Sequence, residues 1–86
     1  RLQVRPSERR RALNEVVVYV RLISEDVEVW RPVRAEVLAD SSYRIADQPY
    51  DRDIETWEFE PGDRVACRQI ESSDGLILAA SMLAER

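Results

Sequence analysis

The sequence predicts a small all-β protein, an antiparallel barrel of five or six short strands with an N-terminal arm. Apolar and polar residues alternate over several short segments, which is the period of a half-buried strand. Turn-forming residues separate these segments at close intervals, and no stretch of useful length shows helical periodicity. The 86 residues suffice for one domain. Because closure removes the exposed edges of a small sheet, we expect the strands to form a barrel.

The first predicted strand is EVVVYVRLI, residues 15–23, which is rich in β-branched residues. Val16, Val18 and Val20 share one of its faces, and Tyr19 makes the opposite face partly apolar, so both faces are candidates for burial. Residues 1–14 precede it as an arginine-rich arm, in which a proline disfavours a continuous helix.

SEDVEV, residues 24–29, predicts a polar turn followed by re-entry into a second strand, which contains Pro32. Because proline cannot donate a ladder hydrogen bond, we expect Pro32 at a sheet edge or at a bulge that bends the strand. From Val33 to Val37 apolar and polar residues alternate. The ADSS turn, residues 39–42, then leads into a short strand of residues 43–45.

The C-terminal half begins with a polar loop, residues 47–55, followed by WEFE, in which Trp57 and Phe59 alternate with acids and are expected in the core. PGD and SSDG are turn signals on either side of the strand RVACRQIE, and LILAA supplies the last strand. The predicted barrel therefore spans residues 15–80. Residues 81–86 are a tail that closes as a helical turn.

Two segments resemble a known family. VWRPVRAEVLADSSYRI, residues 29–45, resembles the hairpin of SH3-like barrels of the Tudor and KOW kind, and WEFEPGDRVACR, residues 57–68, resembles the Pro-Gly-Asp turn before a strand of such barrels. The chain is also similar to small bacterial proteins that carry these segments. The resemblance implies an SH3-like barrel over about residues 15–80. Barrels of this kind bind peptides, methylated side chains or RNA.

The composition excludes several kinds of chemistry. The chain has no histidine, all 13 basic residues are arginines, and Cys67 is the only cysteine. It therefore lacks the commonest general base and transition-metal ligand, the lysine of Schiff-base chemistry, and an internal disulfide. We expect Cys67 to be an inert buried thiol and the protein to be a cytoplasmic non-enzyme without a cofactor or a metal.

The acidic loop of residues 47–55 is predicted to be a solvated face rather than a calcium loop. Counting from Asp51, position six is Thr56 and position twelve is Gly62, where a calcium loop needs glycine and glutamate. Such a face suits an arginine-rich partner or the protein's own arm.

The leading hypothesis is a protein-interaction module that engages a basic or aromatic-seeking segment of an unknown partner protein. Its candidate residues are exposed-looking aromatics and nearby acids: Tyr50, Trp30, Asp51, Asp53 and Glu55.

The alternative is association with RNA or the ribosome through Arg9, Arg10 and Arg11 of the arm. Residues 12–86 carry eight arginines against sixteen acids, so they repel phosphates, and only the arm attracts them. No apolar run approaches the length that crosses a bilayer, so we expect no membrane association. The oligomeric state is left open between a monomer and a homodimer.

Overall fold

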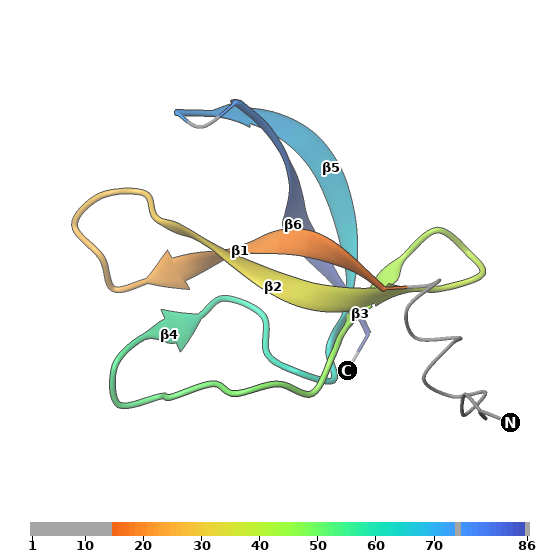
Figure 1. Cartoon of the computed structure of the whole chain (residues 1–86), viewed down its shortest axis with the longest axis horizontal. Coiled ribbons are helices and arrows are strands. Elements are labelled where there is room, and N and C mark those ends of the chain that lie inside the picture. Colours follow the sequence, from red (N-terminus) through yellow and green to blue (C-terminus); the bar gives the residue numbers. More distant parts are fainter. Residues whose placement is uncertain (1–14, 74, 86) are drawn as a thin grey trace, which may run out of the picture.

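The computed structural model describes residues 15–73 and 75–85, and in this part the chain forms six strands and no helix (Figure 1). The strands are β1 (Glu15–Ile23), β2 (Trp30–Val37), β3 (Tyr43–Ile45), β4 (Thr56–Trp57), β5 (Arg64–Ser72) and β6 (Gly75–Glu85). The predicted arm, residues 1–14, lies outside the described residues. Within the described ranges there is no helix with the length and apolar character needed to cross a membrane.

Five strands form a closed ring of hydrogen-bonded neighbours, in the order β1, β2, β3, β5, β6 and back to β1. The pairing of β6 with β1 closes the ring and is parallel, through the single pair Tyr19 and Ala79. The other pairings are antiparallel, and β4 extends the sheet beside Leu22 and Ile23 of β1. The prediction of a small all-β barrel is confirmed, but the sheet is mixed rather than wholly antiparallel.

The core lies on the inner face of this ring, where the alternating residues of β1 meet those of β2 and β5. Val18 and Val20 are fully buried, as the period-two pattern predicts. The prediction that Trp57 and Phe59 fill the core is confirmed, since they are 5% and 7% exposed. The residues of the buried cluster are Val18, Val20, Leu22, Val33, Ala35, Ile45, Trp57, Phe59, Val65 and Ala80.

Pro32 lies at an edge and not at a bulge. The register of β1 with β2 runs without a shift from Glu15 opposite Glu36 to Arg21 opposite Trp30. The Arg34 N–H donates to Gln48 Oε1 (3.0 Å), and Gln48 Nε2 donates to the Arg34 carbonyl (2.9 Å), so both backbone groups face away from β1. By strand alternation the Pro32 nitrogen also faces away from β1, and no described strand pairs with it there. The absence of an N–H at Pro32 therefore removes no hydrogen bond between strands.

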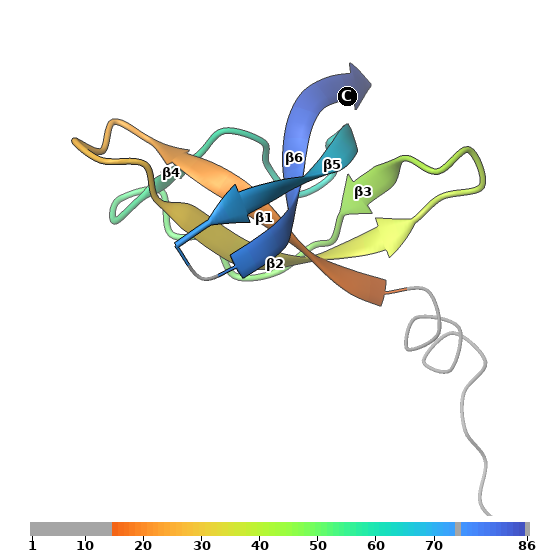
Figure 2. The ribbon, with the colours of Figure 1, turned by 90° about the horizontal axis from the view of Figure 1, so that it is seen from above.

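The bulges occur instead between β5 and β6, where the register shifts between Arg64 and Val65 and again between Ala66 and Cys67. The two strands bend strongly, and their hairpin arches over β1 and β2 (Figure 1, Figure 2). Residues 81–85 belong to β6, so the predicted helical turn after Ala80 is wrong in this range. Pairing with β5 overrides the local preference, because it places Leu83 opposite Val65 and against the core.

We predict that Ile45→Ala lowers the free energy of unfolding by about 2–5 kcal/mol, because Ile45 is 1% exposed and truncation leaves a cavity in a closely packed core. Ile54→Ala is the matched control, because Ile54 is 75% exposed and its loss should change stability by less than about 0.5 kcal/mol. Urea denaturation followed by tryptophan fluorescence measures both. Equal effects of the two substitutions would contradict the assignment of the core.

Candidate functional site

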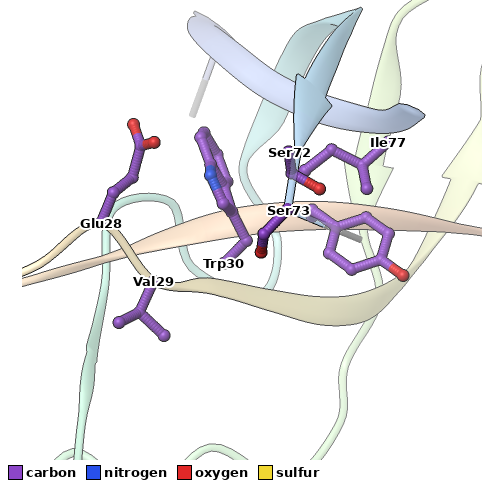
Figure 3. Close-up of a pocket in the computed structure, with 7 residues that line it drawn as sticks. Glu28, Val29, Trp30, Ser72, Ser73 and Ile77 are labelled. Carbon is purple, nitrogen blue, oxygen red and sulfur yellow. The ribbon is translucent and has the colours of Figure 1, made fainter. Parts of the chain in front are cut away.

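A surface pocket of about 230 Å³ lies between the β1–β2 ribbon and the tip of the β5–β6 hairpin. We call it the Trp30 pocket. It lies outside the main core, on the opposite side of β1 and β2. The residues that line it are Tyr19, Glu28, Val29, Trp30, Ser72, Ser73 and Ile77 (Figure 3).

The floor of the pocket follows from the alternation of β1 and β2. Val18 and Val20 point into the core, so Tyr19 between them points to the outer face. Trp30 is the register partner of Arg21, which is two residues along β1 from Tyr19, so Trp30 and Tyr19 lie on the same outer face of neighbouring strands. Both rings are half-buried. The outer face of the ribbon thus carries two aromatic side chains.

The opposite wall comes from the bent hairpin. Ile77 alternates with Leu78, which packs on the core, so Ile77 faces the outer surface of β1 and β2. It is only 7% exposed although it is not part of the main cluster. At the tip, Ser72 Oγ donates to the Gly75 carbonyl (2.9 Å), which fixes the short turn that carries Ser73.

The polar groups of the pocket are one carboxylate, which accepts hydrogen bonds, one indole N–H, which donates, and three hydroxyls, which can do both. Figure 3 shows the side chains of Glu28 and Trp30 on the same side of the strand, and Val29 between them on the other side. Trp30 stands between Glu28 on one side and the two serines on the other. Of the described residues that line the pocket, one carries a negative charge and none carries a positive charge. The pocket therefore favours a cationic or neutral ligand over an anion.

Tyr50, the aromatic predicted to be most exposed, is half-buried and packs against the core. Its ring stacks on Trp57 with the centroids 4.2 Å apart, and the Arg52 guanidinium carbon lies 4.4 Å from its centroid. Because Trp57 and Arg52 both lie over the Tyr50 ring, they must occupy its opposite faces. The Tyr50 hydroxyl also accepts the Trp57 N–H (2.7 Å). Neither face of this ring is open to a partner.

Glu55 joins the polar loop to β2. Arg31 donates to its two carboxylate oxygens, from Nε at 2.9 Å and from Nη2 at 2.6 Å, and Trp57 Nε1 donates to Oε1 at 2.7 Å. The bonds from Arg31, and next the bond from Trp57, lower the pKa of Glu55. A carboxylate held by three donors is a structural tie between the loop and the strand.

Asp51 and Asp53 form a turn in the same loop. Asp51 Oδ1 accepts the Asp53 N–H (2.9 Å), and the Asp51 carbonyl accepts the N–H groups of Ile54 and Glu55 (both 3.1 Å). Both aspartates are exposed. In the described part of the chain, no three histidine, cysteine, aspartate or glutamate side chains gather as a metal site.

The structure therefore divides the predicted partner-binding residues between two faces. Trp30 alternates with Arg31, so it points away from the side of β2 that Glu55 contacts. Tyr50, Asp51 and Asp53 lie with Glu55. Arg9, Arg10 and Arg11 lie outside the described residues.

The sequence interpretation missed the other walls of the pocket, namely Tyr19, Ser72, Ser73 and Ile77. The partly apolar second face of residues 15–23 was the one available signal, since it indicated that something covers the outer side of β1. Comparisons of the chain with protein-family models, with curated proteins and with solved structures find no match.

Cys67 is half-buried against the core, and burial raises the pKa of its thiol to about 11. We predict that iodoacetamide alkylates Cys67 in the folded protein about a hundredfold more slowly at pH 8 than in the urea-unfolded chain, because the thiolate fraction falls about tenfold for each pKa unit. Mass spectrometry at timed intervals measures both rates. Equal rates would show an accessible, ordinary thiol.

We predict that Glu55→Gln lowers the free energy of unfolding by about 1–2 kcal/mol at pH 7; the half-exposed Arg31 keeps the effect modest. Because the folded pKa of Glu55 is lowered, its contribution is complete above the unfolded pKa of about 4.3 and is lost as the pH falls through the folded value.

The difference between the wild type and Glu55→Gln should therefore shrink below about pH 4, in urea titrations repeated across the acidic range. Asp53→Asn removes an exposed carboxylate from the same loop and serves as the control, with little effect expected at any pH. A pH-independent difference for Glu55→Gln would contradict the role of the ionised carboxylate.

Proposed function

We propose that the protein is a non-catalytic protein-interaction module that holds a segment of a partner protein in the Trp30 pocket. The observation that carries the proposal is the pocket itself, whose aromatic side chains, Tyr19 and Trp30, come from the neighbouring strands β1 and β2. Tryptophan and tyrosine are enriched among the residues that dominate binding energy at protein interfaces. The resemblance to SH3-like barrels supports the same class of function.

The surroundings of the pocket suit a partner surface. Val27 in the β1–β2 turn is 71% exposed and precedes Glu28 of the pocket lining, so an apolar side chain projects from a turn that borders the pocket. Exposed apolar residues beside an aromatic pocket are typical of contact surfaces. A segment that enters the pocket can therefore bury further apolar area at its rim.

The charge of the β1–β2 turn favours a basic partner. Glu25, Asp26 and Glu28 are exposed within four residues of one another. Complementary charge at the rim of an interface increases the association rate and selects among partners. The acids of the loop around Asp51 lie on the other face of β2, so the acids of the β1–β2 turn are the ones placed to recognise a partner at the pocket.

The chemistry of the chain favours binding over catalysis. It has no histidine and no lysine, and its one thiol has a raised pKa that keeps it protonated at neutral pH. A reduced, half-buried cysteine also suits the bacterial cytoplasm as the place where the module works. RNA binding through Arg9, Arg10 and Arg11 stays a prediction about residues outside the described range.

We predict that Trp30→Ala abolishes capture of a partner protein by the immobilised chain from lysate of the source cell, because it removes the largest side chain of the pocket. Ile54→Ala, which removes an exposed apolar residue far from the pocket along the chain, should retain the partner. Quantitative mass spectrometry of nuclease-treated eluates compares the three proteins, and circular dichroism verifies that each is folded.

A partner recovered equally by all three folded proteins would overturn the assignment of the pocket. Recovery that nuclease treatment abolishes and Trp30→Ala leaves unchanged would favour the RNA alternative instead.

A further inference from the structure

We infer that the ligand of the Trp30 pocket is the guanidinium group of an arginine side chain in an extended segment of the partner. This inference rests on the proposed function and names the chemical group that the pocket selects. It follows from the rings, the acceptors and the charges that the fold brings to one place.

The rings provide a surface for a planar cation. Trp30 and Tyr19 lie on the same outer face of adjacent strands, and Ile77 faces them from the hairpin. A cation within about 6 Å of an aromatic face is attracted by the ring quadrupole, and tryptophan is the strongest such partner. The weakly hydrated guanidinium also stacks on aromatic faces, and its aliphatic stem can contact Ile77.

Groups that can accept hydrogen bonds lie on the two sides of Trp30. Glu28 extends beside Trp30 on one side, and the Ser73 hydroxyl lies at the hairpin tip on the other (Figure 3). A guanidinium has five N–H donors in a rigid fork, so one group above the indole can donate in both directions. The compact ammonium of lysine cannot donate to both sides from one plane, so this arrangement favours arginine over lysine.

The negative charge around the pocket is concentrated at one end, where it favours the entry of a cation. Glu25 and Asp26 precede Glu28 in the exposed turn, so the negative potential is highest at that end. Arg21 is the register partner of Trp30 and borders the pocket along β1. An incoming arginine is therefore directed to the Glu28 end, away from Arg21, and an acidic segment is repelled by the three acids of the turn.

The test is a titration of the full ¹⁵N-labelled chain with a capped Gly-Arg-Gly peptide, followed by NMR. The Trp30 Nε1–H resonance should shift saturably. The Trp57 Nε1–H, which is buried and bonded to Glu55, is an internal control that should stay in place. Capped Gly-Lys-Gly should bind at least about threefold more weakly than Gly-Arg-Gly. The peptide with neutral citrulline in place of arginine should bind at least about tenfold more weakly than Gly-Arg-Gly.

Two variants of equal charge separate the pocket from general electrostatics. Glu28→Gln should weaken binding of Gly-Arg-Gly by about threefold to tenfold, whereas Glu25→Gln, in the same turn but outside the lining, should weaken it by less than about twofold. Trp30→Ala, followed through the backbone amide resonances of Tyr19 and Ser73 because this variant lacks the indole signal, should weaken binding by about tenfold. Glu28 is exposed, so its variant tests the site even where Trp30→Ala perturbs the fold.

Equal binding of the citrulline peptide, or equal losses in Glu28→Gln and Glu25→Gln, would overturn the inference. If no arginine peptide binds while capture of the partner still depends on Trp30, the guanidinium assignment fails and the proposed function stands. If partner capture is also independent of Trp30, the proposed function fails.

Discussion

The unshifted antiparallel register of β1 with β2 is the constraint on which the rest of the structure depends. Because it holds from Glu15 to Arg21, each side chain of β1 keeps to one side of the ribbon. Val18 and Val20 enter the core, and Tyr19 between them faces the Trp30 pocket. A slip by one residue would exchange the two sets and move the valines into water. The same backbone pairing therefore specifies both the hydrophobic core and the surface proposed to bind a partner.

Local pattern was enough to predict the parts of the fold that depend on neighbouring residues. The strand Glu15–Ile23 and the turn at Gly62, which has φ +96°, agree with alternation and turn chemistry. The end of β6 could not be predicted, because Ser81 and the residues after it are held as a strand by β5 across two register shifts. Pro32 was compatible with an edge or a bulge, and the choice depends on the unshifted register of β2 with β1, which lies in a different segment of the chain.

The candidate site was predictable only in part, because it is made by contacts between distant segments. Trp30 was identified, but the wall that faces it comes from Ser73 and Ile77, which reach it through the bend of the β5–β6 hairpin. In the polar loop the composition indicated solvent exposure. The pairing of Glu55 with Arg31, 24 residues away, and the stacking of Tyr50 on Trp57 instead give these residues structural roles. Composition reports the polarity of a segment and not the partners that its side chains find.

The barrel closes between β6 and β1 through the single parallel pair of Tyr19 and Ala79, and Tyr19 also lines the pocket. A ligand in the pocket would contact the strand at which the barrel closes. Ligand binding in the pocket and closure of the barrel are then thermodynamically linked, since a ligand that binds only the closed form shifts the equilibrium toward it. Conversely, a separation of β6 from β1 would move Ile77 away from Tyr19 and so open the wall of the pocket. The residence time of a ligand in the pocket would then depend on how often β6 separates from β1.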